Sequence, residues 1–204
     1  MDLMTAITQR RSVRAFGQEP IDPAVLSQMI EAARVGPSAA NRQPLEYLVV
    51  TDPETCQALY ECLKWAAYIA PHGDPPPDGR PTAYVVVLRN QELELAAQAA
   101  YDVGAAIQTI LLVAVAQGLG ACWLRSVNVP RAGGLLGVPE GYTLDSVVAL
   151  GRPAEQPVRV DLAPGDAGLE VIKYWRDQSG LHHVPKRALE AVLHWNRFGR
   201  RQPG

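Results

Sequence analysis

The sequence is poor in cysteine and in net charge. Its three cysteines are Cys56, Cys62 and Cys122, and they form no CxxC pair. An odd number of cysteines is typical of a reducing compartment rather than of a disulfide-stabilised secreted domain. The formal net charge of -2 gives no general attraction to nucleic acid or to an acidic membrane surface. We therefore expect neither as a partner, and an anionic ligand has to be met by local positive charge.

Long uninterrupted apolar runs are also absent. The longest run covers residues 96–116 and is broken by Gln98, Tyr101, Asp102, Gly104, Gln108 and Thr109. This pattern predicts a buried helix rather than a membrane span. The first 15 residues carry Asp2, Arg10, Arg11 and Arg14, and they lack the apolar core and cleavage site of a secretory signal. The expected location is the cytoplasm.

What the sequence does contain is the balance of an ordinary globular protein. Hydrophobic residues make up 48% of it and charged residues 20%. Its 204 residues can bury one sizeable core but are too few for two domains of usual size. We expect a single domain over residues 1–204, with a frayed tail from about residue 197.

Helices and strands are both predicted, without strict alternation. The predicted helices are 3–11, 23–35, 54–70, 91–117, a short one from Pro130, and 185–195. The predicted strands are 46–50, 83–88, 121–124, 144–150 and a possible edge strand at 158–160. Residues 72–81, rich in proline and glycine, are expected to form a loop. This order favours an α+β sandwich over a doubly wound sheet.

A cluster of cations ends the first predicted helix. It consists of Arg10, Arg11, Ser12 and Arg14. Guanidinium groups donate paired, charge-assisted hydrogen bonds to phosphate oxygens, and a serine hydroxyl can add another. The cluster is therefore a candidate phosphate site. The alternative is that the arginines only complement the negative end of the helix dipole.

A turn-rich stretch follows the second predicted helix, at residues 36–44. Its candidate binding residues are Pro37, Ser38, Ala39, Asn41 and Gln43. Small residues let a flat ring approach the backbone, and the two amides offer both donors and acceptors to a heterocycle edge. Alternatively, Ser38 and Asn41 only satisfy the backbone of a turn.

Two further segments place glycines at the ends of strands. They are residues 118–125, which include Trp123, Leu124 and Arg125, and residues 149–153, which include Gly151 and Arg152. Glycine at such junctions lets backbone N–H groups point at a ligand, and Arg152 adds positive charge. The alternative is that these glycines only form turns.

The order and spacing of these four segments resemble the nitroreductase family over nearly the whole chain. The matching motifs are R-R-S-x-R-x-F at 10–16, P-S-x-x-N-x-Q-P at 37–44, G-L-G-x-x-W-L at 118–124 and A-L-G-x-P at 149–153. The resemblance implies that the first segment grips a flavin phosphate, with Gly151 and Arg152 nearby. It also implies that the second lies against the flavin, often from the partner subunit. Backbone near Trp123 and Leu124 would face the ring.

The same resemblance implies the fold and the chemistry. The expected fold is a sandwich with a central mixed, mostly antiparallel sheet flanked by helices, in an intertwined homodimer. FMN would lie at the subunit interface, with helix 96–116 in the interface core. Electrons would pass from NADH or NADPH to a small electron-poor acceptor such as a nitroaromatic or a quinone, in a ping-pong mechanism. Leu45 replaces an aromatic found in many members, and the 72–81 loop is short, so the substrate pocket is expected to differ.

Other functions fit the sequence less well. Flavin-cleaving, dehalogenating or azoline-oxidising relatives share the scaffold, and a non-catalytic flavin-binding protein is a further alternative, as is a helical interaction module. The adjacent His182 and His183 cannot easily face one metal ion, and no nearby ligands complete a site. No serine has a G-x-S-x-G setting, and no G-x-G-x-x-G follows a strand. We therefore expect neither a metal site, nor hydrolysis, nor a Rossmann nicotinamide site.

Overall fold

A five-stranded antiparallel sheet forms the centre of the molecule in a computed structural model that describes residues 1–70 and 72–201. The strands are β1 (Phe16–Gly17), β2 (Leu45–Val50), β3 (Ala83–Asn90), β4 (Gly120–Leu124) and β5 (Tyr142–Pro153). Their order is β1-β5-β3-β2, and β4 also pairs with β5. Within this sheet each pairing is antiparallel, and an isolated parallel bridge joins Ser12 to Ala121. With helices on both faces, the predicted α+β sandwich is confirmed.

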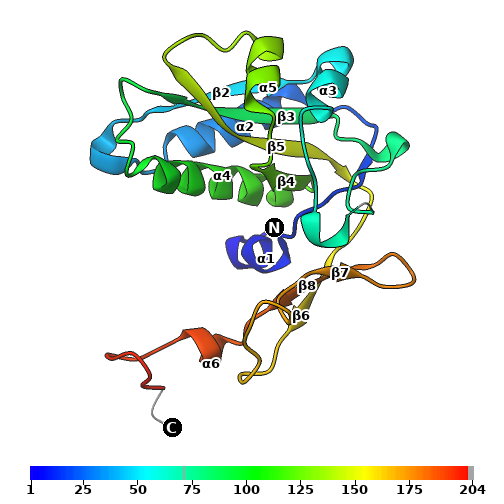
Figure 1. Cartoon of the computed structure of the whole chain (residues 1–204), viewed down its shortest axis with the longest axis vertical. Coiled ribbons are helices and arrows are strands. Elements are labelled where there is room, and N and C mark those ends of the chain that lie inside the picture. The colour runs from blue at the N-terminus through cyan, green and yellow to red at the C-terminus, as the bar shows by residue number, and fades with distance from the viewer. Residues whose placement is uncertain (71, 202–204) are drawn as a thin grey trace.

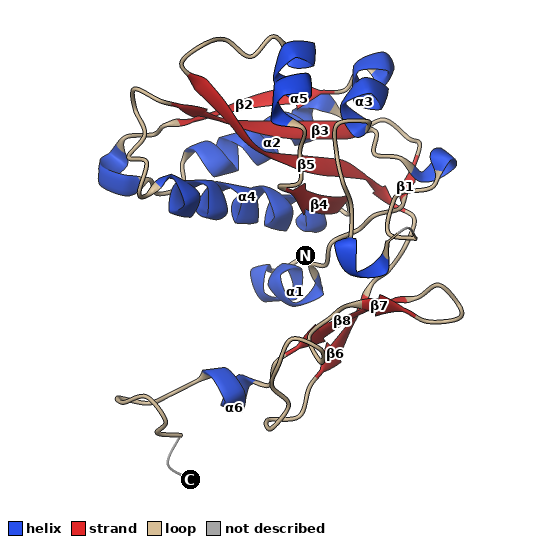
Figure 2. Cartoon of the chain, viewed as in Figure 1, coloured by secondary structure: helices blue, strands red, loops and turns tan. Residues whose placement is uncertain are grey.

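Helices cover both faces of this sheet, as Figures 1 and 2 show. One face carries α2 (Pro23–Arg34) and α4 (Ala99–Ala116), and the other carries α3 (Pro53–Tyr60) and α5 (Val129–Leu136). Along β3, Val85 and Val87 join the core beneath α2 and α4, whereas Tyr84 and Val86 join the core beneath α3. Successive strand residues point to opposite faces, so a strand buried on both sides is continuously apolar. That explains the valine run of β3.

The helix starts follow capping chemistry. The Asp22 carboxylate accepts a hydrogen bond from the backbone of Ala24, with Pro23 at the first helical position, as predicted. Asp52 caps α3 in the same way, with Pro53 next to it. The first helix, α1 (Leu3–Gln9), is capped by Asp2 and packs against α4.

A second, smaller sheet follows the central body. It contains β6 (Val158–Asp161), β7 (Trp175–Arg176) and β8 (His182–Lys186), in the order β6-β8-β7 with β6 and β8 parallel. This sheet and the short α6 (Leu189–Val192) lie beyond α1, away from the central sheet (Figure 1). The predicted edge strand 158–160 is thus confirmed as β6, and it has a parallel partner.

Three predicted helices were too long. α3 ends at Tyr60 rather than at residue 70, because Cys62 and Lys64 are tied through their backbones to Asn128 and Ser126. α4 begins at Ala99 rather than at residue 91, because residues 91–98 form turns after β3. The predicted final helix 185–195 is mostly wrong: residues 185 and 186 belong to β8, where they pair with β6, and only residues 189–192 are helical.

Two smaller expectations have mixed outcomes. The 72–81 segment contains a single 3-10 turn at Pro77–Gly79 and otherwise lacks regular structure, as expected for a loop. Residues 197–201 of the tail form hydrogen-bonded turns, in which Trp195 donates to Arg200 over 2.8 Å. Residues 202–204, also predicted to fray, lie outside the described residues.

α4 is long and apolar enough to cross a membrane by length and composition. In this fold, however, eight of its residues are buried, and they pack among the side chains of α2, β3 and β5. It is the core helix that its polar interruptions predicted.

Candidate functional site

Three of the four sequence motifs meet at one edge of the central sheet. The backbone of Val13 donates a hydrogen bond to the Ala121 carbonyl over 3.0 Å, which holds the N-terminal segment along β4. Opposite Gly120 in the sheet register lies Gly151 of β5. The arginine segment, the β4 segment and the end of β5 are therefore brought together, although more than 100 residues of sequence separate the first from the second.

Glycine at both junctions is required by close approach. A Cβ atom on Gly120 would lie 2.8 Å from the Val13 side chain, and one on Gly151 would lie 2.9 Å from the Phe16 side chain. Such contacts are far inside normal packing distance. The two glycines therefore let the N-terminal segment lie directly on the sheet.

A positively charged hollow opens beside this segment. Its volume is about 770 Å³. The cations that line it are Arg10, Arg11, Arg159, Lys186 and Arg187, against the carboxylates Asp161 and Glu190. Burial lowers the pKa of Arg10, of Arg11 and of Lys186, and for Lys186 the nearby Arg10 and Arg11 lower it further. The cations thus repel one another in a partly desolvated hollow. A bound anion such as phosphate would relieve this repulsion.

Sequence reasoning missed three of these cations, Arg159, Lys186 and Arg187. Lys186 and Arg187 were placed in a helix without a role, whereas Lys186 ends β8 and lies within reach of the N-terminal arginines. The available signal was the Lys-Arg pair itself, but its neighbours could not be known without the pairing of β6 and β8.

A second hollow lies further along the segment, next to Arg14, and has a volume of about 650 Å³. It is lined by the predicted residues Arg14, Trp123, Leu124 and Arg125, together with Lys64, Trp65, Tyr174 and others that the sequence did not single out. The Lys64 backbone donates to the Ser126 carbonyl over 2.9 Å, which fixes this chain segment beside β4. The Arg14 guanidinium lies 5.2 Å from the centre of the Tyr174 ring.

Several buried donors around these hollows have no acceptor in the described part of the chain. They are Nε of Arg11, Nε of Arg14 and Nε1 of Trp65. Buried donors without partners carry a desolvation cost, and a bound ligand that accepts hydrogen bonds removes it. The residues present therefore fit an anionic, acceptor-rich cofactor such as FMN.

The second sheet is fastened next to the second hollow. The Arg14 backbone donates to the Glu155 carboxylate, and Glu155 forms an ion pair of 2.7 Å with Arg176 of β7. The side chains of both partners are mostly buried. These contacts hold Tyr174 and His182, whose rings stack with centres 5.3 Å apart, beside Arg14.

Arg152 has a different environment from the other predicted cations. It lies opposite Gly17 in the pairing of β1 with β5 and is exposed, and neither hollow includes it in its lining. Ser12 and Gly151 likewise lie at the sheet edge between the hollows rather than in their walls.

The fourth motif lies elsewhere in the chain, at the opposite end of α4. Pro37, Ser38, Ala39, Asn41 and Gln43 form a bend beside the first turn of α4, where the Ala39 backbone donates to the Asp102 carboxylate over 2.8 Å. The arginine segment instead lies beside β4, which follows the other end of α4 (Figure 1). The rise of α4 between Asp102 and its last residue is roughly 20 Å. One chain therefore does not bring the bend to the arginine segment.

The bend is a tightly built structure. Ala40, Asn41 and Gln43 all have φ near 50°, a region that residues other than glycine rarely adopt. The Ser38 hydroxyl accepts from the Gln43 backbone over 2.9 Å, so this side chain does satisfy turn backbone. Asp102 is 5% exposed, and its second carboxylate oxygen has no partner among the described residues.

The chain is similar to known proteins over most of its length. A model of the Nitroreductase family matches residues 7–152. A Methanothermobacter thermautotrophicus protein named "Putative NADH dehydrogenase/NAD(P)H nitroreductase" is 31% identical over 173 residues, which cover 81% of this chain and 85% of that protein. A Thermus thermophilus protein named NADH dehydrogenase is 29% identical over 202 residues, with 86% and 97% covered.

A solved structure gives the same result. The Desulfovibrio desulfuricans protein solved in complex with FMN superposes with a TM-score of 0.63 at 27% identity, covering 76% of this chain and 88% of that one. With a family match over most of its length, this chain belongs to the nitroreductase family of oxidoreductases, as its four motifs predicted.

Proposed function

We propose that the chain is an FMN-dependent oxidoreductase that passes electrons from NAD(P)H to a small electron-poor acceptor, such as a nitroaromatic or a quinone, by a ping-pong mechanism. The observation that carries the proposal is the pair of hollows along residues 10–14, one cationic and one lined by unpartnered donors and aromatic rings. The FMN in a solved relative supports the choice of cofactor.

Each hollow has its own task in this proposal. Arg10, Arg11, Lys186 and Arg187 would hold the phosphate, because guanidinium and ammonium groups supply charge-assisted hydrogen bonds to its oxygens. Arg14 and Trp65 would donate to the ring system, and the β4 backbone near Trp123 would lie against it. The redox chemistry is that of bound FMN.

The protein's own part is binding and orientation. The sheet edge and the stacked Tyr174 and His182 fix the position of Arg14, so its charge is in place before the cofactor binds. If the nicotinamide and the acceptor use the same hollow in turn, each must leave before the other binds. That order gives the ping-pong kinetics.

We place the bend of residues 37–43 in the site of a second copy of the chain, within an intertwined homodimer. The bend and the arginine segment of one chain lie at opposite ends of α4. α4 also leaves a stripe of apolar and small side chains partly uncovered, including Tyr101, Ala105 and Leu112. α6 and the residues after it expose Leu189, Val192 and Phe198, which is 92% accessible. Exposed apolar surfaces of this kind mark interfaces.

The same proposal includes the cellular location and the domain boundaries. A single cytoplasmic domain over residues 1–204 that acts on small molecules fits the composition and the near-neutral charge.

Loss of the phosphate contacts is the test of this function. Changing Arg10 and Arg11 together to alanine is expected to weaken FMN binding by at least about 100-fold, because each charged hydrogen bond to the phosphate contributes about 1.5–3 kcal/mol. Arg131→Gln is the matched control, since Arg131 lies exposed on α5 and lines neither hollow. Flavin absorbance after gel filtration measures the effect. Wild-type flavin content in the double variant would contradict the assignment.

Mixing the holoprotein with NADH or NADPH in a stopped-flow instrument tests the catalytic part. The proposed reductase bleaches the flavin band with at least one nicotinamide, and the band returns when a quinone or nitroaromatic is added. A protein that keeps its yellow colour with both nicotinamides is a flavin-binding protein without this activity.

A further inference from the structure

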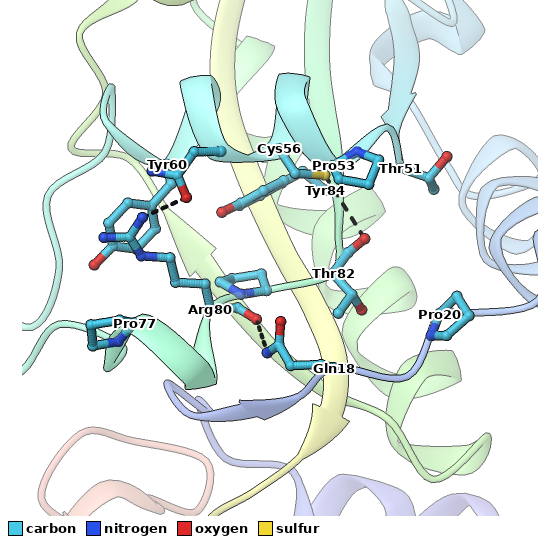
Figure 3. A pocket seen from close by; sticks show the side chains of 12 residues that line it. Gln18, Pro20, Thr51, Pro53, Cys56, Tyr60, Pro77, Arg80, Thr82 and Tyr84 are labelled. Carbon is cyan, nitrogen blue, oxygen red and sulfur yellow. Dashed lines mark hydrogen bonds between the residues drawn. The ribbon is translucent and has the colours of Figure 1, made fainter.

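A separate cavity lies beside α3, on the face of the central sheet that α3 and α5 cover. It encloses about 260 Å³ and is lined mainly by residues from β3, α3 and the 77–82 segment, with Gln18, Pro20 and Thr51 completing the wall (Figure 3). It shares no lining residue with the two hollows along the arginine segment. Nothing in the proposed flavin chemistry uses it.

Two buried polar groups at this cavity have no partner among the described residues. The Tyr84 side chain is fully buried, and its hydroxyl makes no hydrogen bond. Nε of Arg80 is likewise a buried atom without a hydrogen bond. Burial raises the pKa of Tyr84, so the hydroxyl keeps its proton and can donate. Figure 3 shows the Tyr84 hydroxyl on the side of the cavity where Arg80 lies. The cavity therefore presents two donors that lack acceptors.

The Arg80 side chain is fixed before any ligand arrives. Its guanidinium lies over the Tyr60 ring, 4.0 Å from the ring centre, and donates to the Gln57 side chain. The Gln18 amide donates to the Arg80 carbonyl over 3.0 Å. A cation held in place in this way loses little conformational freedom on binding an anion.

The charge and shape of the cavity restrict the chemical class of its ligand further. Arg80 is the charged residue of the lining, and Glu61 pairs with it at 3.8 Å from outside the lining. Pro20, Pro53, Pro77 and Pro81 supply apolar walls next to the Tyr60 ring. Polar donors at one end and apolar walls around them are the pattern of a small-molecule site.

We propose that this cavity binds a small carboxylic acid with an apolar body, its carboxylate accepting hydrogen bonds from Tyr84 and Arg80. The cavity volume admits a molecule of about the size of benzoate. This proposal does not depend on the proposed flavin function, and the two can be tested separately.

The experiment uses the FMN-loaded protein and 4-fluorobenzoate as the probe, followed by fluorine NMR. The neutral 4-fluorobenzamide is the matched ligand control. We expect saturable binding of the acid, at least about tenfold weaker binding of the amide, and a similar loss in both Tyr84→Phe and Arg80→Gln. Tyr84→Phe keeps the buried ring and removes only an unpartnered hydroxyl, so the variant is expected to fold with an unchanged or higher melting temperature.

The flavin spectrum separates this cavity from the hollow beside Arg14. Binding at the proposed cavity leaves the flavin absorbance unchanged and persists in Arg14→Gln. The proposal is overturned if 4-fluorobenzoate does not bind, if the amide binds equally well, or if Tyr84→Phe binds the acid as the wild type does.

Discussion

His182 is a buried histidine that stays neutral. It is 1% exposed, and neither ring nitrogen has a partner among the described residues. Burial, together with the nearby charges of Arg14 and Arg176, lowers its pKa to about 4, against a smaller opposing effect of Glu155. A neutral ring stacked on Tyr174 supports Arg14 without adding a competing cation.

This histidine should make the protein less stable in mild acid. In the unfolded chain His182 takes up a proton near pH 6.5, whereas in the folded chain it does so only near pH 4. Its contribution is therefore constant above pH 6.5 and is lost as the pH falls from there towards 4. At pH 5 the loss amounts to about 1–2 kcal/mol.

Urea unfolding of the wild type and of His182→Phe at pH 7 and at pH 5 measures this loss. Phenylalanine preserves the stack on Tyr174 but cannot take up a proton. We expect the wild type to lose about 1–2 kcal/mol more than the variant between the two pH values. Equal losses in the two proteins would show that His182 is not the titrating group.

At the level of elements, one carboxylate ties the bend to α4. The bend contains three non-glycine residues with positive φ, and each such residue costs of order 1 kcal/mol unless its surroundings impose it. Asp102 is the α4 side chain that accepts a hydrogen bond from the bend. It therefore acts as a positioning residue for the segment proposed to reach the partner's flavin.

Removing this tie should have two effects. Asp102→Ala is expected to lower the free energy of unfolding by about 1–3 kcal/mol, because the Ala39 backbone N–H loses its acceptor. It should also weaken FMN binding several-fold. Asp102→Asn keeps an acceptor oxygen at the same place and should restore most of both quantities, as measured by urea unfolding and by flavin titration. An asparagine variant as damaged as the alanine variant would mean that the charge, not the hydrogen bond, matters.

Local chemistry predicted some elements well and long-range pairing decided others. α2 was found from Asp22 and Pro23, and β3 from its apolar run, because capping and burial leave marks within the segment itself. β8 was not found, since its residues form a strand only through partners about 7 and 25 residues earlier in the chain. The end of α3 was missed for the same reason, because Cys62 and Lys64 bond to a segment more than 60 residues away.

The site shows the same division. Motif spacing identified the arginine segment and β4, which the structure brings together. Lys64, Trp65 and Lys186 could not be identified because they reach the hollows through those distant pairings. Nor could spacing reveal that the bend of residues 37–43 lies at the opposite end of α4.

At the level of the whole molecule, the uncovered stripe of α4 should control assembly. Tyr101 is 73% exposed, and Leu112 is half-buried on the same helix. Changing both to glutamate places charge in the proposed interface, so we expect a monomer that has lost most of its flavin. Leu135→Glu is the control, because Leu135 is 41% exposed on α5, on the other face of the sheet. Analytical ultracentrifugation with absorbance detection reads both outcomes, and a flavin-loaded monomer would refute the shared site.

The length of α4 has a genetic consequence. Each proposed pocket takes its arginines from one chain and its bend from the other, so a lesion in either segment damages both pockets of a uniform pair. When a chain defective only in residues 10–12 pairs with one defective only in residues 37–43, both lesions fall on the same pocket and the other is intact. Two inactive alleles expressed together should thus complement each other, restoring up to about half of the normal activity per mixed pair.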